Sequence, residues 1–531
     1  MRLRFRHMDV RTVVVCLLGL CVAGPGCQTP RAEVSDAVEP RAVSSRQSNG
    51  HPVERDRPPF QDELTEDSDP IEFVSLTQPE FPASDEPVAA YSLEDVIASV
   101  YRAYPSLQAS FFNRNIAQGE HLSAQGNFDT KLKGASENGP TGFYQTYRHS
   151  LGIEQPTYWG GSVFGGYRIG RGDYQPWYLE RQTNDGGEFK AGVSMPLLRN
   201  RAIDERRAQL GTTAQGTHLV EPRIHQDLID FVQMASEAYW AWVATGQKYR
   251  IQQQLLSLAE TRNTGIEREV ELGARDPPDL EDNRRSIVSR EAKVIAARQK
   301  FQQASFKLSI FLRDINGVPI VLAEDQLPVF PELESLDLPD LDADIQTAFR
   351  NRPELLENEI LREQIDIERA LAENDALPNV DAVILGSQDV GEPTSPKRDK
   401  SEFELEAGIF VDVPLQRRKA RGKQVSLEGK ASQLVLKRGL IEDKIVAELQ
   451  SVHAALQATI ETVEKTQEAV RLANYMAEVE QKKFNAGTGD LFTLNLREQQ
   501  AAEAAENEVD ALLEYFRANA AYRAILARDH Q

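Results

Sequence analysis

The hydrophobic and polar positions of this chain follow one order of patterns, and that order occurs twice. In each half a helix-like period opens with a proline, Pro105 or Pro353, and then gives way to strand-like alternation. Each alternating region closes with a second proline, Pro196 or Pro414, and a very long helical pattern follows. Ahead of the first copy, Ser92 is expected to cap the opening helix. A duplication of this size predicts two copies of one structural unit.

The long helical patterns are the strongest signal in each half. Their apolar and small positions are spaced alternately by four and three residues, the repeat of a left-handed coiled coil. In the first half these positions are Phe231, Ala235, Ala238, Trp242, Thr245, Tyr249, Gln252, Leu256 and Ala259. In the second half they are Ile445, Leu449, Val452, Leu456, Thr459, Val463, Thr466, Val470, Ala473 and Ala477. Each pattern predicts a helix of roughly 70 residues, about 100 Å long, that must pack along partners of similar length.

A glycine turn follows each long helix, and a return helix then completes a hairpin. Gly273 and Gly487 are expected to end the long helices, because glycine adopts the left-handed conformation that closes a helix. Asp279 and Asp490 are expected to cap the return helices.

The alternating regions lie at residues 128–196 in the first half and at 380–385 and 403–413 in the second. Within 403–413, every second residue from Phe403 to Val413 is apolar, which predicts a strand with two different faces. The residues between them are Glu404, Glu406, Gly408, Phe410 and Asp412. The first region is the longer one. It holds either an extra hairpin or a long external loop, and the sequence leaves both open.

The N-terminus has the pattern of a secretion signal, with several arginines before an apolar run at 13–22 that is too short to span a bilayer. The three cysteines of the chain are Cys16, Cys21 and Cys27. Gly26 and Cys27 resemble the end of a bacterial lipoprotein signal, so we expect Cys27 to be lipidated. Ordinary cleavage nearby, with an inert cysteine, is the alternative.

The stretch that follows Cys27 is rich in proline, serine and charged residues, and it cannot bury enough apolar surface to order itself. The predicted organisation is a signal peptide at 1–26, a disordered tether at 27–90, a first repeat at 91–315, a connection at 316–341 and a second repeat at 342–531.

Composition and motifs argue against several functions. The 531 residues carry a net charge of -22, which disfavours nucleic acid as a partner. The phosphate-loop, zinc-protease and serine-hydrolase motifs are absent. His218 and His225 share a helix face without a third ligand at suitable spacing, and the glycines at 160–172 lie among strand-like aromatics. We therefore predict no enzyme, no cofactor and no metal site.

The ordered set of motifs resembles the TolC-like outer-membrane efflux proteins from Ser92 to Leu526. It comprises the paired prolines that open and close each half and the second turn, Phe484 to Leu491, with Arg497 to Gln500 after it. The resemblance implies a homotrimer in which each subunit gives four strands to a 12-stranded outer-membrane β-barrel. Its helices would form a periplasmic α-barrel. The fold class expected is mainly α with a small β part. The family's acidic ring after the second turn is not expected here, because residues 493–497 contain no aspartate.

The function that the resemblance implies is a passive exit duct, lipid-anchored in the outer membrane, for a tripartite efflux pump or a type I secretion system. Its partners would be a periplasmic adaptor, an inner-membrane pump and outer-membrane lipid. The candidate adaptor contacts are the turn residues Gly273, Asp276, Asp279, Gly487 and Asp490. The alternative is a lipid-anchored periplasmic coiled-coil scaffold or pump adaptor that does not span the membrane.

Overall fold

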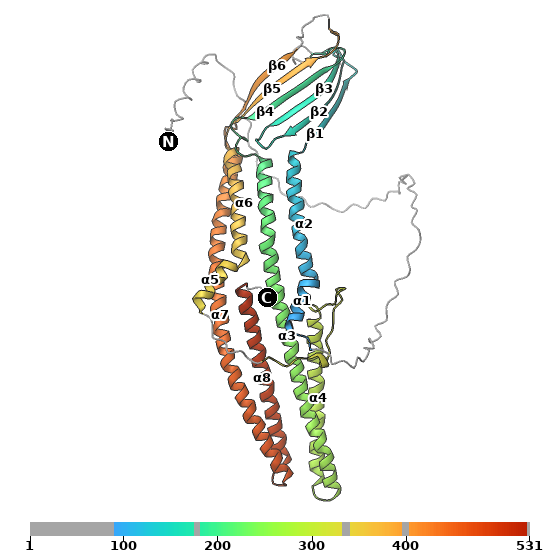
Figure 1. Ribbon diagram of the computed structural model, residues 1–531, viewed down its shortest axis with the longest axis vertical. Coiled ribbons are helices and arrows are strands. Elements are labelled where there is room, and N and C mark those ends of the chain that lie inside the picture. Colours follow the sequence, from blue (N-terminus) through green and yellow to red (C-terminus); the bar gives the residue numbers. More distant parts are fainter. Residues whose placement is uncertain (1–89, 175–180, 332–339, 396–402, 528–531) are drawn as a thin grey trace, which may run out of the picture. The chain divides into compact units, whose positions relative to one another are not determined.

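The computed structural model describes residues 90–174, 181–331, 340–395 and 403–527. The described part is mainly α-helical and carries one antiparallel sheet (Figure 1). The predicted signal peptide at 1–26, the lipidation site Cys27 and the tether up to residue 89 lie outside the described residues.

The same order of elements occurs in both halves of the chain: two helices, strands, a long helix and a return helix. The first half contains α1 (Leu93–Ala103), α2 (Pro105–Gln125), β1 (Lys131–Gly139), β2 (Thr146–Pro156), β3 (Ser162–Gly172), β4 (Glu188–Pro196), α3 (Glu205–Glu271) and α4 (Pro277–Leu308). The second half contains α5 (Leu341–Asn351), α6 (Pro353–Asp375), β5 (Asn379–Asp389), β6 (Glu404–Asp412), α7 (Arg418–Asn485) and α8 (Leu491–Ile525). The predicted long helices are thus α3, with 67 residues, and α7, with 68.

The sheet has six strands in the order β1-β2-β3-β4-β5-β6, so every strand is paired with its neighbour in sequence. The sheet therefore has two strands more than the four per subunit that the resemblance implies for the barrel. The long alternating region of the first half contains an extra hairpin rather than an external loop, because β2 and β3 are hydrogen-bonded to each other and to the flanking strands.

Most of the predicted helix ends are where the sequence places them. Ser92 forms a capping box with Asp95, and Asp490 accepts a hydrogen bond from the backbone N–H of Thr493. Gly273 and Gly487 have φ of 72° and 73°. The cap predicted at Asp279 is wrong. Pro277 suits the first helical position because it has no N–H to satisfy, so α4 begins there and its N-cap residue is Asp276.

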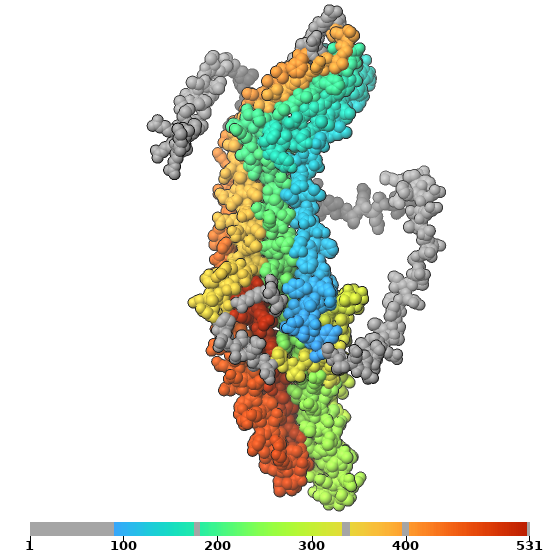
Figure 2. Space-filling model, in the orientation of Figure 1, coloured from blue at the N-terminus to red at the C-terminus, as the bar shows by residue number. Residues whose placement is uncertain are grey.

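The helices pack as a layer. Nearest the sheet α3 packs against α2 and α6, and α6 packs against α7. Towards the turns α3 packs against α4 and α8, and α8 packs against α7. Figures 1 and 2 show α2, α3 and α6 side by side between the sheet and the level of α1 and α5. No helix in the described ranges combines the length and apolar character that crossing a membrane requires.

The main core lies where the two halves of the chain meet along α3 and α8. Trp242 is fully buried there, and the rings of Trp240 and Phe516 stack with their centroids 3.9 Å apart. Phe330, from the connection between the halves, stacks on Phe516 at 5.6 Å. Because large aromatic side chains bury much apolar surface and pack with defined geometry, this cluster fixes the two helices against each other.

Candidate functional site

The two faces of the sheet differ in chemistry. Side chains alternate between the faces, and the strand registers place most apolar positions on one side, with Phe164, Val383, Leu385 and Phe410 on the other. This apolar face includes Leu132, Leu151, Ile153, Val163, Phe189, Val193, Met195, Ile384, Leu405, Ile409 and Val411, and each of these side chains is exposed. A contiguous apolar surface of this kind marks a contact with lipid or with another protein.

The opposite face of the sheet, the polar face, carries most of its charged residues. They are Lys131, Lys133, Glu137, Arg148, Glu154, Arg168, Glu188, Lys190, Asp381, Asp389, Glu404, Glu406 and Asp412. Arg168 pairs with Glu188, and Lys133 pairs with Glu154, across neighbouring strands. These cross-strand pairs hold charged side chains on a surface that suits water rather than lipid.

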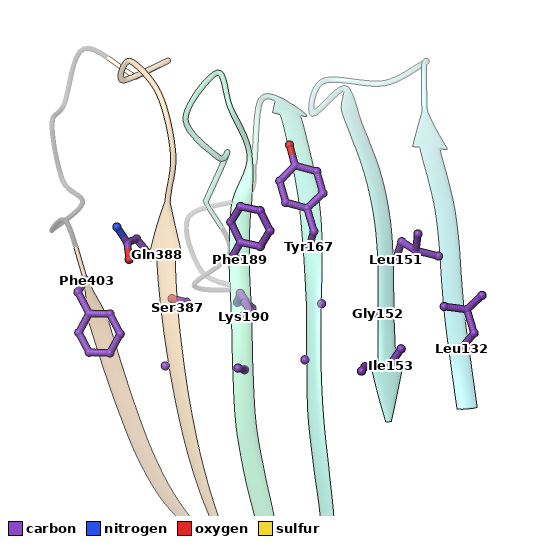
Figure 3. Close-up of a pocket in the computed structure, with 14 residues that line it drawn as sticks. Leu132, Leu151, Gly152, Ile153, Tyr167, Phe189, Lys190, Ser387, Gln388 and Phe403 are labelled. Atoms are coloured by element: carbon purple, nitrogen blue, oxygen red, sulfur yellow. The ribbon is translucent and has the colours of Figure 1, made fainter. Parts of the chain in front are cut away.

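A groove of 650 Å³ crosses the apolar face. Figure 3 shows it running from Leu132 on β1, past Leu151 and Phe189, to Phe403 just before β6. Its floor includes Gly165 and Gly386, where the absence of a side chain leaves a depression between the flanking residues. Its lining is almost wholly apolar, so the groove belongs to the same surface and has no chemistry of its own.

A buried ionic cluster joins the two helical hairpins, and we call it the interhairpin latch. It consists of Arg262 on α3, Arg290 on α4 and Glu498 on α8, whose side chains are each only 6% exposed. Glu498 accepts hydrogen bonds from both guanidinium groups, with 2.9 Å between Arg290 Nη2 and Glu498 Oε2. Asn495 Oδ1 accepts from Arg262 Nη1 at 2.9 Å and from Arg290 Nη2 at 3.1 Å.

The charges of the latch do not balance, because one carboxylate faces two guanidinium groups. Burial lowers the pKa of the Arg262 guanidinium from its ordinary value, although the nearby Glu498 carboxylate opposes this effect. Arginine nevertheless keeps its charge in proteins. Since removing one partner of a buried ion pair leaves an uncompensated charge, the contact between hairpins depends on Glu498.

Sequence reasoning missed the latch, although a signal for it exists. Leu491, Leu494, Glu498 and Ala502 lie three or four residues apart on one buried face of α8, so a carboxylate occupies a position where such a face calls for an apolar side chain. Its two arginine partners lie more than two hundred residues away in sequence, and the chain alone does not connect them.

The five turn residues predicted as adaptor contacts lie in the two hairpin turns. Gly273 and Gly487 close the helices, and Asp490 caps α8. Asp279 lies in the first turn of α4, 3.4 Å from the guanidinium of Arg275. Asp276 is exposed and makes no side-chain capping bond. Four of the five thus support their turn through a side chain or a glycine conformation, whereas Asp276 acts as an N-cap residue through its backbone alone.

Two apolar side chains beside the turns are exposed, and the sequence reasoning did not identify them. Leu272, at the end of α3, is 76% exposed, and Phe492, at the start of α8, is 70% exposed. Since burying a large apolar side chain is favourable, such residues are better candidates for a protein contact than the turn glycines.

The described ranges contain no group of three or more histidine, cysteine, aspartate or glutamate side chains placed to hold a metal ion. His218 and His225 both lie on α3. The glycines at 160–172 lie in β3 and in the turn before it, as the sequence indicated.

The chain is similar to solved outer-membrane channels along most of its length. One is the Campylobacter jejuni CmeC outer membrane channel, with 11% identity over 84% of this chain and 90% of that chain and a TM-score of 0.59. The outer membrane protein VceC from Vibrio cholerae has 13% identity over 83% and 97%, with a TM-score of 0.57. The Neisseria gonorrhoeae MtrE outer membrane channel in its open state has 14% identity over 83% and 89%, with a TM-score of 0.57.

No protein-family model and no curated protein matches the sequence. The identities to the solved channels are low, so the likeness is one of fold. The chain has the TolC-like fold that its ordered motifs predicted.

Proposed function

We propose that this chain, which has the fold of outer-membrane efflux channels, is a passive exit duct in the outer membrane. The observation that carries the proposal is a sheet with one exposed apolar face and one charged face, joined directly to helices about 100 Å long. A sheet divided in this way fits between lipid and a water-filled lumen. The helices would then extend into the periplasm.

A single copy does not enclose a channel, so the proposal includes a homotrimer. The outer helices of the layer, α2, α4 and α7, expose apolar side chains. Examples are Phe112 and Ile116 on α2, Val288 on α4 and Leu436 on α7, each more than half exposed. Three copies side by side would cover these residues and close both an α-barrel of paired long helices and a β-barrel.

The duct would do no chemistry, and an inner-membrane pump would supply the energy. A periplasmic adaptor would connect the two, and it would bind the hairpin turns that contain Asp276 and Asp490. Cys27, once acylated, would anchor the N-terminus in the outer membrane. Efflux of small molecules and type I secretion of proteins use the same passive duct, so both belong to the proposal.

Opening of the duct would require the α7–α8 hairpin to move away from the α3–α4 hairpin. The interhairpin latch lies across that boundary, so an adaptor that binds the turns would have to separate Glu498 from its two arginines. Two packings of nearly equal energy are enough for such a switch, and adaptor contacts at the turns would bias it.

The test is extraction from the cell envelope. The proposal predicts that the protein leaves the outer membrane only in detergent and then migrates as a trimer that dissociates on heating. Release of a soluble monomer by cleavage of its lipid anchor would contradict the proposal and support the periplasmic scaffold or adaptor.

A further inference from the structure

The six-stranded sheet has two edges, and the strand at each edge has one side on which a further strand could pair. Within the described residues β1 and β6 each have a neighbour on one side only. Unpaired backbone groups are costly in lipid, and a spanning sheet must close on itself. β1 runs away from the helices because it follows α2, and β6 runs towards them because it precedes α7. Beside each other in neighbouring copies, they would be antiparallel.

The charges at the helical ends of the two edge strands are complementary. On the polar face, β1 begins beside the helices with Lys131 and Lys133, and β6 ends beside them with Asp412. Opposite charges across a strand pair are favourable, so Asp412 of one copy would fit beside the two lysines of the next.

At the far ends of the edge strands the charged side chains have partners within the same chain. Glu137 of β1 lies 3.7 Å from Arg148 of β2, and Glu404 of β6 lies 3.0 Å from Arg181.

The additional hairpin is an integral part of this sheet. Gly152 and Gly166 face each other across β2 and β3, and a Cβ on Gly166 would lie only 2.8 Å from Gly152 Cα. The turn between these strands is anchored on the helical side: the ring of Tyr158 stacks on Phe128 at 4.3 Å, and Arg206 donates to the Gly160 carbonyl at 3.2 Å.

The apolar and polar faces also continue through the hairpin without a break. Leu151 and Tyr167 are neighbours in register, Tyr167 is opposite Phe189, and all three lie on the apolar face. A hairpin that lay outside the barrel wall would not need apolar and polar faces that continue those of the neighbouring strands.

We infer that β1 of each copy pairs with β6 of the next, and that three copies close an eighteen-stranded barrel in place of the 12-stranded one. This inference rests on the proposed trimer. Barrel diameter grows roughly in proportion to strand number, so the wall would be about 1.5 times as wide as a 12-stranded one. Barrels of this size leave an aqueous channel, so the membrane segment would admit bulkier cargo than a 12-stranded wall allows.

Cysteine cross-linking in purified trimers tests the inference, because all native cysteines lie at or before Cys27. Ser136→Cys on β1 is combined in turn with Leu405→Cys, Ala407→Cys, Ile409→Cys and Val411→Cys on the same face of β6. One of these combinations is expected to give a covalent trimer on oxidation. Ser136→Cys with Ala191→Cys, on the interior strand β4, is the matched control and should stay monomeric in denaturing electrophoresis. Oxidised parent protein controls for Cys27.

A different cross-linking pattern would overturn the inference. If β1 and β2 lay outside the wall, β6 would pair with β3, and Val163→Cys would cross-link to the β6 positions while Ser136→Cys would not. That result, in a protein that is still trimeric, would overturn the eighteen-stranded wall and leave the exit duct intact. A protein that is not trimeric at all would instead overturn the proposed function.

Discussion

The interhairpin latch depends on single side chains, and Glu498 is the one that holds it together. It is the only carboxylate in the cluster and lies between Arg262 and Arg290, all three nearly buried. A water-exposed salt bridge contributes little to stability, whereas the removal of one partner from a buried salt bridge is strongly destabilising. The latch is therefore a point where one substitution should change how the two hairpins pack.

Glu498→Gln should loosen α8 from α3 and α4, because two buried guanidinium groups would lose their counter-charge. Loss of one partner of such a pair costs about 3 kcal/mol or more. Backbone amides of α8 near Asn495 should therefore exchange with solvent on the order of 100-fold faster, as hydrogen exchange measures. Glu503→Gln, exposed on the same helix, is the control. Equal exchange rates in the two variants would show that the latch does not stabilise the packing of α8.

A second residue, Asp204, is predicted to make stability depend on pH. It caps α3, and its carboxylate accepts from Arg207 Nε at 2.7 Å and from Arg206 Nε at 3.0 Å. Burial alone would raise its pKa, but the hydrogen bonds from Arg207 and Arg206 hold that pKa below its ordinary value. A lowered pKa in the folded state means that the charged cap stabilises the fold above the unfolded pKa and is lost as the pH falls through the folded value.

Asp204→Ala should therefore lower the free energy of unfolding by about 1–2 kcal/mol at pH 7. The deficit should shrink as the pH falls below about 4, the ordinary pKa of aspartate. Thermal melting of the parent protein and the variant across this pH range measures the stability deficit. Asp204→Asn is a second variant, which keeps a hydrogen-bond acceptor without the charge. A deficit that stays constant down to pH 2 would contradict the role assigned to the charge.

At the scale of elements, the two faces of the sheet make the sharpest prediction. Leu151 and Ser150 are neighbours on β2, both are exposed, and they point to opposite faces. An arginine on the lipid face near the middle of a bilayer costs about 2–4 kcal/mol, whereas one towards the lumen does not. Leu151→Arg should therefore reduce the heat-sensitive trimer in outer-membrane fractions, and Ser150→Arg should leave it unchanged. The reverse pattern would mean that the faces are assigned the wrong way round.

The hairpin turns give a prediction about the adaptor. A photo-reactive amino acid at Leu272 or Phe492 should form an adduct with a periplasmic adaptor in cells, identified by mass spectrometry, because both side chains are exposed beside the turns. The same probe at Ile315, which is 84% exposed but far along the chain from either turn, is the control. Adducts with an adaptor at Ile315 alone, or no adduct with an adaptor at any of these positions, would contradict the prediction that the adaptor binds at the turns.

Sequence reasoning predicted these elements well where the signal is local. Periodicity located α3, α7 and both hairpins, and turn chemistry located the caps at Ser92 and Asp490. It failed at Asp279 because two consecutive prolines set the start of α4 one turn earlier. The count of strands was missed because alternating patterns among many glycines define a hairpin only through pairing, which is not local. The latch was missed for the same reason.

At the scale of the whole molecule, the proposed duct would consist of a sheet with an exposed apolar face, a layer of long helices and two hairpin turns. The proposed trimer would explain together the exposed apolar residues on α2, α4 and α7 and the open edges of the described sheet. The lipid anchor at Cys27 and the adaptor contacts remain predictions, because they depend on residues outside the described ranges or on partners.

The measurement that tests the central claim most directly is ion conductance of purified trimers in a planar lipid bilayer. The account predicts a discrete, repeatable single-channel step, and a larger or more persistent one for Glu498→Gln, in which the hairpins separate more easily. Trimers shown to be inserted that stay silent, both as parent protein and as Glu498→Gln, would contradict the claim that this protein forms a duct.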